Sequence, residues 1–148
     1  MALGAGWEAQ LNHWHARYAA QGTAYIARAN PPVKMLGKMR AGGRFTAVWA
    51  GKGPTDYVGC LSDGRCVAFD AKATRAQAFK RSQVERHQAV MLDAIDRLGG
   101  VTGIALKCPH GTWWLDWPAL RDFHRASIRA EDLPLVGRRM GSEGWLGC

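Results

Sequence analysis

The 148-residue sequence lacks several features that would assign it to a familiar class. No apolar run approaches the ~20 residues of a membrane span. The N-terminus has no basic, apolar and small-residue pattern of a signal peptide. We therefore expect a cytoplasmic protein with no membrane contact, in which the four scattered cysteines remain free thiols. Cys108 and His110 have no second ligand pair at a suitable spacing, which argues against structural zinc.

Acidic residues are also missing between Glu8 and Asp56. The chain has 20 Lys and Arg against 12 Asp and Glu, a formal net charge of +8. Such an excess favours a polyanionic partner such as nucleic acid or an acidic membrane face. A solvated surface that only keeps the protein soluble has the same composition, so charge alone leaves both interpretations open. The acid-free interval contains Arg17, Arg28, Lys34, Lys38, Arg40, Arg44 and Lys52.

The chain does contain enough apolar residues for one folded domain, since 47% of it is hydrophobic and seven residues are Trp. Apolar periodicity predicts helices over 7–20 and 82–98, and a third from Pro118. Ser82 and Glu85 fit a capping box, and Gly99 ends the second helix. If the third helix persists, Arg121, Arg125 and Arg129 form one cationic stripe. Strands are predicted over 23–28, 45–50, 101–107 and 112–115, with a hairpin over 53–74.

Two segments have little apolar pattern. Residues 30–44 combine Pro31, Pro32, glycines and basic residues, which predicts an irregular, projecting basic arm. The strand over 45–50 would then return to the core. The tail, 134–148, is rich in Gly and Arg and is expected to be loosely held. The order of elements describes a mixed sheet flanked by helices, an α/β or α+β domain.

The register of the hairpin decides which side chains share a face. A two-residue turn at Asp63-Gly64 would direct Asp56 away from Asp70. A three-residue loop over 62–64 pairs Leu61 with Arg65 and sets Asp56 opposite Asp70. Because residues two apart on a strand share a face, only this register brings Asp56, Asp70 and Lys72 together. We therefore predict the three-residue loop, which also sets Cys60 opposite Cys66.

This grouping suits phosphodiester hydrolysis. Mg²⁺, or Mn²⁺ in its place, prefers oxygen ligands, activates water and neutralises an anionic transition state. Asp56, Asp70 and the backbone carbonyl of Ala71 are the candidate ligands. Lys72 would orient the attacking water or stabilise developing charge. A surface ion pair can produce the same pattern, so the pattern alone is weak evidence. The basic segments around it favour the metal-site interpretation.

The residues Asp56 and Asp70-x-Lys72 resemble the PD-(D/E)xK nuclease motif, and their surroundings resemble RecU-type Holliday junction resolvases. The likeness spans most of the chain. It is carried by Glu8, Asn12, Tyr18 and Gly22, by 30–33 (NPPV), 55–59 (TDYVG), 69–74 (FDAKAT), His87-Gln88, Gly99-Gly100 and 101–106 (VTGIAL). The chain departs from the family at Asp70, where the pattern usually has Glu. It is also shorter than many members, with a reduced N-terminus, which would fit a phage-encoded or otherwise minimal version.

The resemblance implies a restriction-endonuclease-like fold with a stalk formed by the basic arm. It implies a homodimer that nicks two opposed strands of a four-way DNA junction, in a bacterial cell or phage-infected host. It also implies roles in the site for Glu8 as an acidic residue near the metal, for Gln88 as a helix residue facing the site, and for Thr55 through hydrogen bonding. The basic residues expected on DNA are Lys34, Lys38, Arg40, Arg44, Lys52, Arg75, Lys80 and Arg81.

Two other functions remain open on the sequence. The same nuclease fold can act on linear duplex DNA, as restriction and repair enzymes do. A non-catalytic, basic DNA-binding module would keep the charge but not the hydrolysis. Cleavage of a junction beside a matched duplex separates these possibilities.

Overall fold

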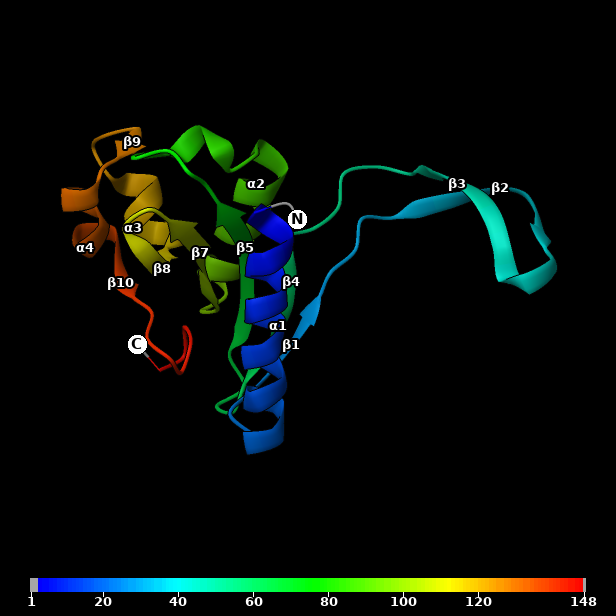
Figure 1. Cartoon of the computed structure of the whole chain (residues 1–148), viewed down its shortest axis with the longest axis horizontal. Coiled ribbons are helices and arrows are strands. Elements are labelled where there is room, and N and C mark those ends of the chain that lie inside the picture. The colour runs from blue at the N-terminus through cyan, green and yellow to red at the C-terminus, as the bar shows by residue number, and fades with distance from the viewer. Residues whose placement is uncertain (1–2, 148) are drawn as a thin grey trace.

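A computed structural model describes residues 3–147 and shows a six-stranded mixed sheet flanked by helices (Figure 1). The strand order is β1-β4-β5-β7-β8-β10, with β5 and β7 parallel and the other pairs antiparallel. The strands are β1 (Ala24–Arg28), β4 (Tyr57–Leu61), β5 (Cys66–Ala73), β7 (Val101–Cys108), β8 (Gly111–Asp116) and β10 (Gly137–Arg139). Within residues 3–147, no helix is both long and apolar enough to span a membrane.

Helices cover the two faces of this sheet around separate cores. Helix α1 (Leu3–Gln21) packs its predicted stripe of Trp7, Leu11, Trp14 and Tyr18 onto one face. The other face carries α2 (Arg86–Arg97), α3 (Trp117–Asp122) and α4 (Leu133–Val136). The odd-numbered residues of β4 and β5 face α1, which leaves their even-numbered residues on the α2 side.

The hairpin of β4 and β5 has the predicted register. Cys60 lies opposite Cys66, and Tyr57 lies opposite Phe69. The Leu61 N–H donates to the Arg65 carbonyl at 2.9 Å, which closes a three-residue loop. Gly64 has a φ of 88°, a conformation that a side chain would oppose. The same register continued by one pair sets Asp56 opposite Asp70.

The basic arm differs from the prediction because it is regular. Strands β2 (Val33–Arg40) and β3 (Arg44–Trp49) form a two-stranded antiparallel ribbon, joined by a turn at Ala41–Gly43. Figure 1 shows this ribbon projecting from the body. The strand predicted over 45–50 does form and leads back toward the body, but it belongs to the ribbon and every residue of β3 is exposed. At the root of the ribbon a Cβ on Gly53 would lie 2.8 Å from the Pro31 Cα, so the two legs touch there.

The second and third helices begin and end elsewhere than predicted. Residues Arg81–Gln83 form a short 3-10 turn, and α2 begins only at Arg86. Its capping box joins Glu85 and Gln88 rather than Ser82 and Glu85. The third helix ends at Asp122, so the predicted stripe of three arginines does not form. Arg121 instead pairs with Asp93, and Arg125 pairs with Asp132.

The C-terminal tail is packed, contrary to the prediction of a loose segment. Strand β10 extends the sheet, and Trp145 is 2% exposed against the α1 core. The Trp145 indole stacks on Trp114 with ring centroids 4.8 Å apart. Its N–H donates to His15 Nε2 at 3.0 Å, which joins positions 130 residues apart. The tail therefore closes one side of the core.

The burial of His15 predicts that the fold loses stability in acid. Burial lowers its pKa from 6.5 to about 4. Because the folded state resists protonation, this contribution to stability is complete above pH 6.5 and is lost as the pH falls toward 4. We expect the free energy of unfolding to fall by about 3 kcal/mol over that range from this group. Urea unfolding followed by Trp fluorescence measures it.

The control for this prediction is His15→Gln, which has no titrating ring. Subtracting its pH profile from that of the wild type isolates the histidine from other acidic groups. Identical slopes of stability against pH for the two proteins would show that His15 protonates as readily in the folded state as in the unfolded one.

Candidate active site

Asp56 and Asp70 are joined by a hydrogen bond where strand β4 begins. The Asp56 N–H donates to Asp70 Oδ1 at 2.8 Å, and Asp56 Oδ2 accepts from the Ala71 N–H at 3.0 Å. If the β-ladder continued, Ala71 would bond the backbone of Thr55. The Asp56 carboxylate accepts this hydrogen bond instead of the Thr55 backbone. The end of the ladder therefore positions the Asp56 carboxylate beside Asp70.

Asp70 lies in an environment that disfavours its charge. The residue has no exposed surface. Burial, reinforced by the neighbouring Asp56 charge, raises its pKa to about 6. Oδ2 of Asp70 is buried and has no hydrogen-bond partner. A buried acceptor without a partner is costly in a folded protein, and a bound cation would satisfy it.

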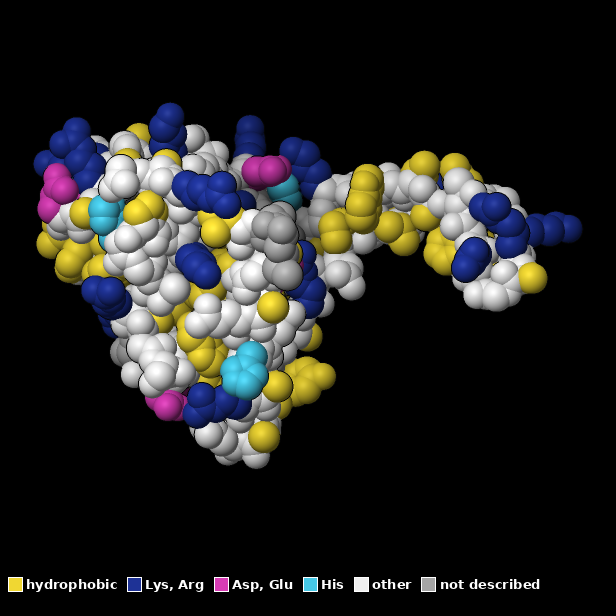
Figure 2. Space-filling model, in the orientation of Figure 1, with side chains coloured by type: hydrophobic (Ala, Val, Ile, Leu, Met, Phe, Trp, Pro, Cys, Tyr) yellow, Lys and Arg dark blue, Asp and Glu magenta, His cyan; other side chains and the backbone are white. Residues whose placement is uncertain are grey.

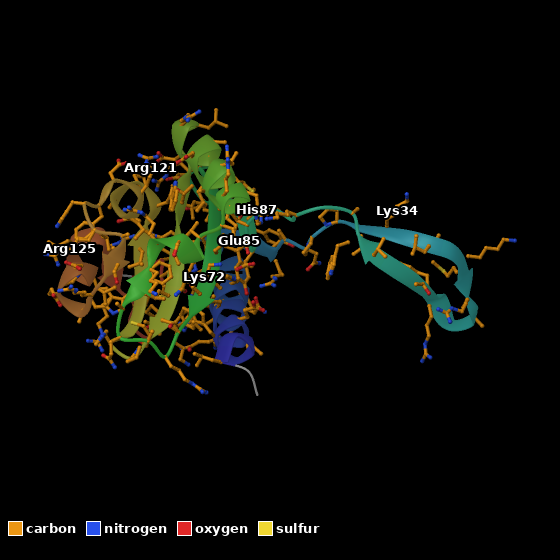
Figure 3. The ribbon with its side chains drawn as sticks, turned by 90° about the horizontal axis from the view of Figure 1, so that it is seen from above. Lys34, Lys72, Glu85, His87, Arg121 and Arg125 are labelled. Carbon is orange, nitrogen blue, oxygen red and sulfur yellow. The ribbon has the colours of Figure 1, made fainter. Side chains whose placement is uncertain are left out.

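Lys72 is held above the same face by the first turn of α2. Its Nζ donates to Gln88 Oε1 at 3.4 Å. The same Gln88 oxygen accepts from the Glu85 N–H at 2.9 Å, as part of the capping box. Figure 3 shows Glu85 and His87 on the side of the body where the ribbon joins it, with Lys72 further into the body. Gln88 therefore faces the site, as expected, and fixes the lysine to the helix start.

The oxygens at this point fit a hard divalent cation. The candidate ligands are the Asp56 carboxylate, Asp70 Oδ2 and the carbonyl of Ala71, whose backbone groups share the strand edge that faces Asp56. Among residues 3–147, no group of three His, Cys, Asp or Glu side chains is placed to hold a metal. Water, DNA phosphate and the backbone would have to complete the coordination.

Glu8 lies near the site and pairs with Arg28, a residue that was not predicted to belong to the site. Glu8 Oε1 contacts Arg28 Nη1 at 2.8 Å. The Arg28 guanidinium lies 5.5 Å from the centroid of the Tyr57 ring. Contact with Glu8 and the charge of Asp56 raise the Arg28 pKa despite its partial burial. Arg28 is therefore a cation that interacts with both Glu8 and Asp56, a role visible only once β1 is placed beside β4.

Thr55 has a different environment from the carboxylates. It is fully buried, and its Oγ1 donates to the Tyr57 carbonyl at 3.2 Å. Its N–H approaches Met91 Sδ at 3.4 Å. These bonds shape the backbone before Asp56, so the side chain supports the position of that aspartate.

The basic residues expected on DNA fall into separate groups. Lys34, Lys38, Arg40 and Arg44 lie exposed along the ribbon, while Arg75 and Lys80 are exposed on the body. Lys52 pairs with Glu85 at 3.7 Å near the ribbon root. Arg81 Nη1 is surrounded by backbone carbonyls, at 2.7 Å from that of Phe123. We therefore assign Arg81 to holding the segment after α3, a role that its neighbours in sequence do not reveal.

At the far end of the ribbon, like charges lie together. Arg40 is directly opposite Arg44. Like charges in directly opposed positions destabilise a strand pair unless an anion neutralises them. Figure 2 shows Lys and Arg side chains gathered at this end and hydrophobic side chains along the rest of the ribbon. This arrangement fits contact with a polyanion.

Comparisons with known proteins find a matching family and a similar fold. The family model described as "RecU: Recombination protein U" matches residues 2–132. A solved structure of Hjc from Archaeoglobus fulgidus, a Holliday junction resolvase, is similar with a TM-score of 0.56. The two chains are 14% identical, and the match covers 92% of this chain and 95% of that one. No curated protein matches the sequence.

Proposed function

Because the chain belongs to the RecU family, we propose that it is a metal-dependent endonuclease that resolves four-way DNA junctions by nicking two opposed strands. The fold that it shares with an archaeal resolvase supports the proposal. The observation that carries it is the pair of Asp56 and Asp70 beside Lys72, with one buried carboxylate oxygen left without a partner.

Each side chain of the site has a distinct role in the proposed hydrolysis. Asp56 and Asp70 would hold Mg²⁺ or Mn²⁺, which supplies an activated water and a counter-charge for the phosphate. Lys72 stabilises the negative charge that develops on the phosphoryl oxygens as water adds to phosphorus and one ester P–O bond breaks. Gln88 acts through Lys72 by holding its ammonium where its charge acts on Asp70.

The ribbon supports the proposal of a homodimer. Its exposed large apolar side chains are Val33, Met35, Leu36, Met39, Phe45, Val48 and Trp49. Val33 lies opposite Trp49 and Met35 opposite Ala47, which makes one face of the ribbon apolar near its root. A two-stranded ribbon alone is marginally stable in water. A second copy packed on this face would stabilise it and place two active sites on one junction.

The test is cleavage of a synthetic four-way junction beside a linear duplex of the same sequence, in Mg²⁺ and in Mn²⁺. We expect paired nicks in the junction and little cutting of the duplex. Lys72→Ala should remove cleavage while salt-sensitive binding persists. Equal cutting of both substrates would instead indicate a nuclease for linear duplex DNA. Binding without cleavage in either metal would indicate a non-catalytic module.

Arg28 offers a separate prediction about metal use. Arg28→Met keeps an apolar stem over Tyr57 but removes the cation beside Asp56 and leaves Glu8 unpaired. The added negative charge should lower the Mn²⁺ concentration for half-maximal nicking about fivefold, which corresponds to ~1 kcal/mol of charge interaction. A metal titration of the nicking rate measures it.

Arg17→Gln is the matched control for this titration. Arg17 also pairs with a glutamate, Glu143, at 2.8 Å, but through the C-terminal tail rather than near Asp56. A metal requirement that is unchanged in Arg28→Met, or changed equally in both variants, would contradict the electrostatic role of Arg28.

A further inference from the structure

Two exposed cysteines face each other across the hairpin that carries the active-site aspartates. Cys60 on β4 is the direct partner of Cys66 on β5, and both are free and exposed. The next pair, Leu61 and Arg65, is joined by a backbone hydrogen bond. Because bonded and non-bonded pairs alternate along an antiparallel ladder, Cys60 and Cys66 form a non-bonded pair, the type whose side chains lie closer.

The position of this pair leaves its sulfur atoms open to solvent. Both residues are even-numbered members of β4 and β5, so their side chains point away from α1. Helix α2 packs on β5 and β7 rather than over this end of β4. Cys108 differs, because it is half-buried, approaches the Gly111 carbonyl at 3.5 Å, and has its thiol pKa raised chiefly by burial.

We propose that Cys60 and Cys66 are a reversible oxidation site that closes into a cross-strand disulfide when the protein meets a small-molecule disulfide. The thiolate of one cysteine attacks the oxidant's S–S bond, forming a mixed disulfide and releasing one thiolate. The opposed cysteine, after losing its proton, attacks the protein sulfur of that mixed disulfide and releases the second thiolate. Two protons leave the protein, and its two sulfurs are oxidised as the oxidant's two sulfurs are reduced.

The geometry favours a bond that forms and breaks readily. A non-bonded antiparallel pair brings Cα atoms to roughly 4.5 Å, near the short limit of the separations that disulfides span. Strained or exposed disulfides are more easily reduced than buried structural ones. The pair is therefore suited to reversible exchange with a thiol pool.

Formation of this disulfide would constrain the two strands that carry the candidate site. Asp56 and Asp70 lie on the same face of the same hairpin, two same-face positions further along each strand. A disulfide would fix the register and twist of β4 against β5 and restrict the opening of the hairpin. Oxidation should therefore slow hydrogen exchange in β4 and β5 more than in β7 and β8.

The experiment incubates the full chain, with Cys148→Ser, in oxidised glutathione and then digests it with trypsin without reduction. Cleavage after Arg65 separates the two cysteines, so an internal bond joins peptide 53–65 to peptide 66–72. We expect this linked pair to be the main product, to vanish in dithiothreitol and to persist in Cys108→Ser.

Cys66→Ser is the variant in which the internal disulfide cannot form. In that variant Cys60 should end as a stable mixed disulfide with glutathione, because no opposed thiol resolves it. Separate glutathione adducts on both cysteines of the parent, a link through Cys108, or two unreacted thiols would each overturn the proposal. The readout needs no DNA, so it is independent of the proposed nuclease activity.

Discussion

Asp70→Asn should abolish junction cleavage while leaving the protein folded and able to bind the junction. The amide retains an oxygen that can accept from the Asp56 N–H, as Asp70 Oδ1 does at 2.8 Å. It cannot supply the second, anionic oxygen that lies buried without a partner. We expect the nicking rate to fall at least ~10³-fold, equivalent to ~4 kcal/mol of transition-state stabilisation, in both Mg²⁺ and Mn²⁺.

The same variant should be more stable than the wild type at neutral pH without metal. Burial raises the Asp70 pKa from 3.8 to about 6, so the ionised carboxylate destabilises the folded state as the pH rises through that interval. Asparagine removes this penalty, which amounts to at most about 3 kcal/mol at pH 7.5. The difference in free energy of unfolding between the two proteins should disappear below about pH 4.

Asp63→Asn is the matched control for both measurements. Asp63 belongs to the same hairpin but is exposed in its turn, where it pairs with Arg65 at 2.8 Å. It should retain full cleavage and show no gain in stability at neutral pH. An active Asp70→Asn enzyme would show that Asp70 is not needed for metal binding. A neutral-pH stability below that of the wild type would show that the buried charge is compensated in the folded protein.

Removing the charge at the end of the ribbon should weaken junction binding without touching the chemistry. The variant Lys38→Gln, Arg40→Gln, Arg44→Gln leaves Asp56, Asp70 and Lys72 unchanged. Loss of three phosphate contacts should lower affinity about 10²-fold near 0.1 M salt and reduce the slope of log affinity against log salt by about 3. The cleavage rate at saturating protein should change less than about threefold, because the catalytic groups are intact.

An equal change of net charge on the body provides the control. Arg65 and Arg97 are exposed and Arg17 is half-buried, and Arg17 and Arg65 already pair with carboxylates. Their triple change to Gln removes the same charge from surfaces outside the ribbon. If both triple variants lose the same affinity, the protein attracts DNA by its overall charge and the ribbon has no special contact.

The grouping of the candidate site residues was predictable because these residues lie within one hairpin. Alternating apolar residues on both sides of Asp63-Gly64 specify a hairpin, and only one register gathers Asp56, Asp70 and Lys72. That register is confirmed by the pairing of Cys60 with Cys66. Arg28 could not be found this way, since its contact with Glu8 depends on how α1 crosses the sheet.

The ribbon and the tail were mispredicted for opposite reasons. Every residue of the ribbon strands is exposed within one chain, so no pattern of buried side chains marks them as strands. The Pro and Gly residues therefore led to the prediction of an irregular segment, despite the strand-forming apolar residues. Its glycines mark regular features, since Gly37, Gly42 and Gly43 have positive φ at the irregularity and the turn. The tail is rich in Gly and Arg, but one Trp145 anchors it through contacts with residues far away in sequence. Composition does not reveal such distant packing.

The ribbon is also structurally separate from the sheet that carries the candidate site. It is inserted between β1 and β4, which are adjacent antiparallel strands, and its ends meet where the Ala29 N–H donates to the Asp56 carbonyl at 2.8 Å. A short turn could connect those strands without altering the sheet. The ribbon is thus an insertion that evolution or design can lengthen, shorten or replace while the sheet and the candidate site keep their geometry.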